Sequence, residues 1–187
     1  MFRSTEQRSS WQRHAGKLLA GAALVIGPIS VWSSPASAAQ VPTCLGLPAT
    51  IVGTVGNDVL NGTPGNDVII GLGGDDTING LGGNDTICGD DGNDRLYGGD
   101  GDDVIQGGNG NDVINGDAGM DSLDGGAGND VVNGGNDDDD LRGGDGDDQL
   151  WGNDSNDYLS GGNGSDLCNG GRGRDQADRS CESVQGI

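Results

Sequence analysis

From Gly53 to Asp178, hydrophobic and polar residues recur on a fixed nine-residue period. Nearly every repeat carries an aliphatic residue at position 8, such as Ile105 or Ile114, among glycine, aspartate and asparagine. This position is Leu, Ile or Val in the first twelve repeats, then Cys168 and Ala177. The period runs without an insertion over 126 residues, or fourteen repeats. So short and unbroken a period predicts a stacked solenoid and not a globular core.

Within each repeat, positions 7 to 9 read as a short strand, such as Val104-Ile105-Gln106, in which only position 8 points inward. Two repeats, turn-strand-turn-strand, make one coil of eighteen residues, and fourteen repeats make seven coils. At about 4.8 Å per coil, the stack would be roughly 34 Å long and have two parallel sheets. We therefore predict an all-β fold, a parallel β-roll, which is a right-handed β-solenoid with eighteen residues per coil and about seven coils.

The turn between these strands has the composition of a cation site. Position 1 is glycine in every repeat, and position 4 is glycine in all but two, where Asp137 and Ser155 stand instead. Glycine permits left-handed backbone angles, so the turn can direct its carbonyl groups inward to one place. Position 6 brings a carboxylate to that place, and carbonyl and carboxylate oxygens are the ligands of calcium. The position 6 residues are Asp58, Asp67, Asp76, Asp85, Asp94, Asp103, Asp112, Asp121, Asp130, Asp139, Asp148, Asp157, Asp166 and Asp175.

The repeated phrase GGxGxDxUx, in which U is aliphatic, resembles the hemolysin-type calcium-binding repeat of the RTX family. The resemblance implies a parallel β-roll with several calcium ions held between successive turns, and position 6 aspartates as ligands from Asp58 through Asp166. In the last repeat Arg172 and Arg174 stand in the turn, where a cation opposes calcium, so we interpret Asp175 as part of an end cap. The toxin, protease and lipase activities found beside such repeats do not carry over to these residues.

The first four repeats depart from the phrase at position 2, which is Thr54, Thr63, Leu72 and Leu81, so their turns are expected to be tighter or less suited to a metal. Residues 44–52 fit the frame loosely, with Ile51 at position 8. We expect an N-terminal cap strand in residues 39–52, the β-roll in 53–178 and a C-terminal cap tail in 179–187.

The N-terminus reads as a secretory signal peptide. Four basic residues precede an apolar run from Leu18 to Ile29, and the small-x-small site Ala36-Ser37-Ala38 follows. A membrane anchor is the alternative, but glycine and proline interrupt the run, which is shorter than the ~20 apolar residues that span a bilayer. We predict a signal peptide in residues 1–38 and an extracellular mature chain.

The mature chain would carry 29 acidic residues, five arginines and no lysine, a net charge of -24. Nucleic acid and anionic membranes require cationic side chains on their partners. This charge therefore predicts no nucleic-acid partner and no membrane insertion, and favours cations.

Four cysteines, Cys44, Cys88, Cys168 and Cys181, lie in the mature part. In an oxidising compartment two disulfides are expected. Four cysteines allow three connectivities, and Cys44 with Cys88 and Cys168 with Cys181 are the shortest closures. A four-thiolate zinc site is the rival, but the chain has no Cys-x-x-Cys pair.

The sequence does not predict an enzyme. The one histidine, His14, leaves with the predicted signal peptide, and no lysine follows it in the mature chain to activate a serine or cysteine. The run Asp137 to Asp140 occupies positions 4 to 7 of an ordinary repeat. We expect a non-enzymatic calcium-binding protein.

Two other functions stay open. One is an adhesion or carbohydrate-binding module that uses calcium to remain folded and contacts extracellular polysaccharide or a cell surface, with Tyr97, Trp151 and Tyr158 as an outward sugar-contact patch or as plain strand decoration. The other is a paired-carboxylate enzyme of polysaccharide metabolism, although no cleft that would raise one pKa is visible in uniform repeats.

Overall fold

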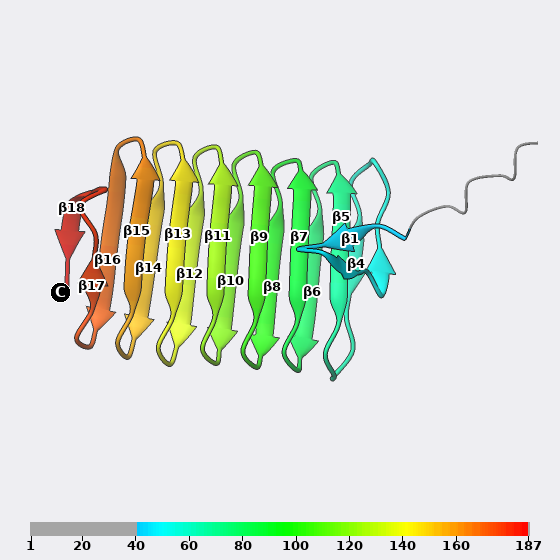
Figure 1. The fold of residues 1–187 in the computed structure, drawn as a ribbon, viewed down its shortest axis with the longest axis horizontal. Coiled ribbons are helices and arrows are strands. Elements are labelled where there is room, and N and C mark those ends of the chain that lie inside the picture. Colours follow the sequence, from blue (N-terminus) through cyan, green and yellow to red (C-terminus); the bar gives the residue numbers. More distant parts are fainter. Residues whose placement is uncertain (1–40, 187) are drawn as a thin grey trace, which may run out of the picture. The chain divides into compact units, whose positions relative to one another are not determined.

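The computed structural model describes residues 41–186, which form a β-solenoid of about seven turns (Figure 1). The predicted signal peptide, residues 1–38, lies outside the described residues. Within the described part, no helix has the length and apolar character needed to cross a membrane. The all-β, parallel fold predicted from the nine-residue period is confirmed.

Strands on one side of the solenoid form what we call the even sheet, and those on the other side form the odd sheet. The even sheet contains β4 (Val59–Asn61), β6 (Thr77–Gly82), β8 (Arg95–Asp100), β10 (Val113–Ala118), β12 (Val131–Asn136), β14 (Gln149–Asp154), β16 (Asp166–Arg172) and β18 (Cys181–Gln185). The odd sheet contains β3 (Ile51–Val52), β5 (Val68–Gly73), β7 (Thr86–Asp91), β9 (Val104–Asn109), β11 (Ser122–Ala127), β13 (Asp140–Asp145), β15 (Tyr158–Asn163) and β17 (Gln176–Ala177).

The core is a single column of position 8 side chains from each sheet. Parallel pairing joins residues eighteen apart, so that Ile114 pairs with Val132 in the even sheet and Ile105 with Leu123 in the odd sheet. These side chains are fully buried or nearly so from Ile69 to Cys168, and Leu60 and Ala177 are partly buried at the two ends. The inward direction predicted for position 8 is therefore correct.

The strands are longer than the sequence predicted. A typical strand, such as β9, has six residues and runs from position 7 through position 3 of the next repeat, which leaves only positions 4 to 6 for the turn. At position 2 the backbone bends to positive φ, as at Gly108 (φ 119°), yet Gly108 still pairs with Gly126 in the next coil. Because each repeat from Leu72 to Gly171 has the same bend at position 2, neighbouring coils stay in register through it.

At the N-terminal end, β1 (Thr43–Cys44) and β2 (Leu47–Pro48) form an antiparallel hairpin. Its two-residue turn, Leu45-Gly46, has positive φ at both positions, as tight hairpin turns require. A disulfide joins Cys44 to Cys88 of β7, and Cys44 packs with Ile70 on the outer side of the odd sheet. Of this segment, only β3 continues the stack, through Ile51 beside Ile69.

At the C-terminal end, β18 adds to the even sheet beside β16. The second disulfide joins the position 8 residue Cys168 to Cys181, and both side chains are buried. Of the three possible connectivities, the structure thus contains the one made of the two shortest closures. With all four cysteines in disulfides, no thiol is left for a zinc site.

Candidate metal centres

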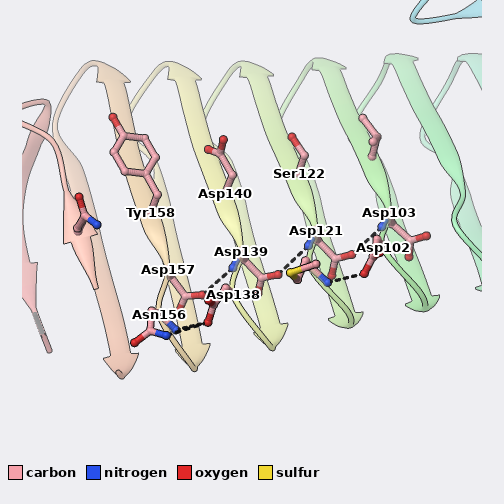
Figure 2. Close-up of a pocket in the computed structure, with 13 residues that line it drawn as sticks. Asp102, Asp103, Asp121, Ser122, Asp138, Asp139, Asp140, Asn156, Asp157 and Tyr158 are labelled. Atoms are coloured by element: carbon pink, nitrogen blue, oxygen red, sulfur yellow. Dashed lines mark hydrogen bonds between the residues drawn. The ribbon is translucent and has the colours of Figure 1, made fainter. Parts of the chain in front are cut away.

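The position 6 aspartates form two rows, one along each edge of the solenoid, and from Asp76 onward one carboxylate oxygen of each links neighbouring coils. Oδ1 of Asp130 accepts a hydrogen bond from the backbone N–H of Asp112 at 2.7 Å, and Oδ1 of Asp139 accepts one from the N–H of Asp121 at 2.9 Å. Figure 2 shows one row, with Asp103, Asp121, Asp139 and Asp157 along the groove that they help to line. The same bond recurs between Asp58 and Asp76 at one end and between Asp157 and Asp175 at the other.

The second carboxylate oxygen, Oδ2, has no hydrogen-bond partner from the third repeat onward, although it is buried. In Asp112, for example, only 1% of the residue surface is exposed. Buried polar atoms without partners are rare in proteins, and a row of them indicates atoms that another group satisfies. The aspartates with this unpartnered oxygen are Asp76, Asp85, Asp94, Asp103, Asp112, Asp121, Asp130, Asp139, Asp148, Asp157, Asp166 and Asp175.

A space beside each position 1 glycine is bordered by this oxygen and by a backbone carbonyl of the next coil. A methyl carbon built on Gly107 would lie 2.3 Å from Oδ2 of Asp112 and 2.4 Å from the carbonyl oxygen of Gly125. The space exists because glycine has no side chain, and its two bordering oxygens come from consecutive coils. The same arrangement recurs from Gly71 to Gly152, whereas at Gly161 and Gly170 the three nearest atoms all belong to the aspartate of the same repeat.

The first coil is different, because threonine occupies its carboxylates. Oδ2 of Asp67 accepts hydrogen bonds from the backbone N–H of Thr63 at 2.6 Å and from its hydroxyl at 2.9 Å. Thr54 binds Asp58 in the same way, at 2.6 and 2.8 Å. These two aspartates, which the sequence also predicted as ligands, thus have Oδ2 engaged within the protein, and Oδ1 of Asp67 also accepts the Thr50 hydroxyl at 3.3 Å. The sequence indicated that position 2 was unusual in these repeats, but not that the threonine would bond the aspartate.

Burial disfavours the ionised form of these carboxylates when no cation is bound. Loss of hydration raises the pKa of Asp94, Asp103 and Asp157 to about 6, that of Asp121 and Asp130 to about 7, and that of Asp139 to about 8. The hydrogen bond from the preceding aspartate's N–H opposes the shift, while neighbouring carboxylates add to it. The row therefore favours any group that brings positive charge, whether a proton or a metal ion.

Side chains alone do not complete a metal site. Among residues 41–186, no three His, Cys, Asp or Glu side chains gather into a cluster that could hold a metal ion. Calcium takes six to eight oxygen ligands. In these spaces backbone carbonyls of the glycine-rich turns have to supply most of them, with one carboxylate oxygen from each aspartate. The donor set is entirely oxygen, which suits calcium and not zinc or copper.

Position 5 forms a second ladder outside the first. The side-chain oxygen of Asn93 accepts the backbone N–H of Asn111 at 2.9 Å, and that of Asn111 accepts the N–H of Asn129 at 2.7 Å. These residues are exposed and their oxygens are engaged between coils. The position 5 side chains therefore serve as structural links between coils.

A family model described as the RTX calcium-binding nonapeptide repeat matches the chain in four copies, over residues 52–87, 89–123, 116–150 and 142–177. These matches cover the solenoid from β3 to β17. A search of curated proteins found no match.

Proposed function

The chain belongs to the RTX calcium-binding nonapeptide repeat family, and from this membership we propose that it is a secreted, non-enzymatic protein whose β-roll folds as it binds several calcium ions. The observation that carries the proposal is the row of buried Oδ2 atoms that no protein group satisfies. Extracellular location is supported by the two disulfides and by the predicted signal peptide.

The aspartates from Asp76 to Asp166 are the proposed calcium ligands. Each has one oxygen fixed in the ladder between coils and the other free to face the space beside a position 1 glycine. Bound calcium supplies positive charge among these carboxylates and takes the oxygens as ligands. Asp58 and Asp67 are left out of the proposed set, because their threonine partners already occupy the Oδ2 atoms.

A non-enzymatic role is supported by the residues at hand. The one histidine of the chain is His14, in the predicted signal peptide, and the one lysine, Lys17, stands there as well. The aspartates with raised pKa values form a repeated row along the solenoid. A catalytic pair of carboxylates, in contrast, would differ in its pKa values from the neighbouring repeats.

Circular dichroism with and without calcium tests the proposal. We expect little β signal in excess chelator and a cooperative gain of signal as calcium rises, with a midpoint of about 0.1 to 1 mM, as in extracellular calcium modules. Magnesium should substitute poorly, because it holds its water more tightly and demands octahedral geometry. A β spectrum that chelator leaves unchanged would contradict the proposal.

One observation favours a second candidate, an adhesion or carbohydrate-binding module that uses calcium to remain folded. Positions 7 and 9 on the outer face of the even sheet carry no carboxylate and include Tyr97 and Trp151.

A further inference from the structure

The outer face of the even sheet presents two continuous columns of side chains, at positions 7 and 9. The strand register aligns residues eighteen apart, so that Tyr97 lies between Asn79 and Asn115, and Trp151 between Asn133 and Asn169. From β4 to β16, the position 9 column is Asn61, Asn79, Tyr97, Asn115, Asn133, Trp151 and Asn169, and the position 7 column is Val59, Thr77, Arg95, Val113, Val131, Gln149 and Leu167. Every one of these residues is exposed or half-buried, with none fully buried.

This face is free of carboxylates in a strongly acidic molecule. Its fourteen positions include one charged residue, Arg95, whereas 29 acidic residues lie between Asn57 and the C-terminus. The corresponding columns of the odd sheet include Asp124, Asp140 and Asp178, and the N-terminal hairpin covers Ile70 and Cys88 at their first two coils. The even face is therefore the larger uncharged and uncovered surface of the two.

Its polar groups are amides with hydrogen-bonding capacity to spare. The side-chain amide of Asn79 donates to Asn61 at 3.0 Å, and that of Asn133 donates to Asn115 at 3.1 Å. Each amide has two N–H groups and two acceptor sites on its oxygen, so one bond leaves most of that capacity unused. The two aromatic rings interrupt this amide ladder, and each has an amide directly on both sides.

We propose that this even face, with Tyr97 and Trp151 as stacking platforms and the neighbouring asparagines as hydrogen-bond partners, binds an uncharged polysaccharide chain. A sugar ring offers an apolar C–H surface to an aromatic ring and hydroxyl groups to amides. The two rings are three strands apart, about 14 Å at the usual strand spacing, so one polymer would contact both.

Charge and periodicity select this partner over others. Nucleic acids and acidic polysaccharides are repelled by the net charge of the chain, and a basic polymer would bind the acidic edges before this face. The face repeats the same groups at every strand, about 4.8 Å apart, which suits a polymer that repeats its own hydroxyl groups at a regular short spacing. The inference rests on the proposed function, because the columns exist only when the roll is folded.

Affinity electrophoresis in native gels containing calcium tests the inference. The purified chain is run with embedded neutral polymers (xyloglucan, hydroxyethyl cellulose, galactomannan and laminarin) and with anionic polygalacturonate. We expect at least one neutral polymer, and not polygalacturonate, to retard it. Tyr97→Ala and Trp151→Ala should each lower the association constant about tenfold, as loss of a central aromatic anchor does. Tyr158→Ala is the matched control on the odd sheet and should leave retardation unchanged.

Circular dichroism of each variant in the same calcium buffer separates binding from folding. A chain without β signal in calcium overturns the proposed function. If the folded chain is retarded by none of the neutral polymers, the proposed binding face is wrong and the proposed function stands. The same holds if the Trp151→Ala and Tyr97→Ala variants are retarded as strongly as the parent. If light scattering instead detects a dimer that Trp151→Ala dissociates, while no polymer retards the parent, this outcome also overturns the polysaccharide proposal and assigns the face to a second copy of the chain.

Discussion

The position 6 aspartate has two oxygens with different surroundings, and the difference explains its chemistry. Oδ1 is held by a backbone N–H of the preceding coil, at 2.8 Å between Asp94 and Asp112, while Oδ2 is buried without a partner. The hydrogen bond to Oδ1 fixes the orientation of Oδ2, and with it the position at which a cation can bind. The carboxylate must lose its proton to bind a metal, which makes the state of the row depend on pH.

Acid should therefore stabilise the roll when calcium is absent. Burial raises the pKa of Asp121 and Asp130 to about 7 and that of Asp139 to about 8, above their values in an unfolded chain. The metal-free roll binds protons that the unfolded chain does not, so its stability rises as pH falls from about 8. The gain in stability from these protons reaches its full value below about pH 4. Circular dichroism in chelator should show β signal growing over this range.

Asp139→Asn serves as the control for this pH effect, because it removes the group with the highest pKa of the row. We expect it to weaken the pH dependence of the β signal between about pH 7 and 8 and to leave the dependence at lower pH unchanged. A metal-free chain whose β signal is lost on mild acidification would contradict the assignment of these protons to the aspartates.

Threonine at position 2 should decide whether a repeat binds calcium. Thr54 and Thr63 fill the oxygens that stay free elsewhere. Replacing both with glycine, the usual residue at this position, removes the hydroxyl bonds and permits the positive φ that position 2 has in the later repeats, where no backbone N–H reaches Oδ2. We expect Oδ2 of Asp58 and Asp67 then to be free. The double variant should bind more calcium ions per chain than the parent, measured by titration calorimetry together with metal analysis after gel filtration. Equal stoichiometry would contradict this prediction. It would mean that Asp58 and Asp67 bind calcium in both the parent and the double variant, or in neither.

At the scale of the coil, the glycine at position 1 keeps open the space between two oxygens. Gly107→Ala would place a methyl carbon 2.3 Å from Oδ2 of Asp112 and 2.4 Å from the carbonyl of Gly125, both well inside van der Waals contact. Overpacking of this kind costs about 1 to 3 kcal/mol. The calcium midpoint measured by circular dichroism should rise several-fold.

Gly65→Ala is the matched control, because a methyl carbon there meets only the Thr63 hydroxyl, at 3.9 Å, and the backbone has no positive φ. Its calcium midpoint should stay close to that of the parent. If both alanine variants shifted the midpoint equally, the effect would come from general loss of glycine in the turns and not from the space beside Gly107.

The sequence predicted the solenoid well because a nine-residue period with one inward aliphatic residue allows few other structures. It predicted the strands too short, since positions 1 to 3 are rich in glycine and read as turn, whereas pairing with identical neighbours keeps Gly108 and Asn109 in the ladder. The threonine bonds to Asp58 and Asp67 were not predicted, because local side-chain geometry decides them. The hairpin's position against β5 and β7 depends on the disulfide partner of Cys44, which spacing left open.

Across the whole molecule, each coil contacts only its neighbours, so stability should follow a nearest-neighbour scheme. Asp112 is linked in both directions, since its Oδ1 accepts from Asp94 and its N–H donates to Asp130. Asp175 accepts from Asp157, but its own N–H has no aspartate of a following coil to donate to, since Asp175 is the last position 6 residue. The two aspartates thus have the same chemistry and different positions in the stack.

We therefore expect Asp112→Ala to raise the calcium midpoint and flatten the titration, because it removes the carboxylate of an internal coil and interrupts propagation toward both ends. Asp175→Ala should change neither the midpoint nor the slope much, since it only frays an end that the Cys168–Cys181 disulfide and β18 already hold. Parallel calcium titrations by circular dichroism, at equal protein concentration, compare the two. Equal effects at both positions would show that the coils bind calcium independently, and the nearest-neighbour scheme would then be wrong for this solenoid.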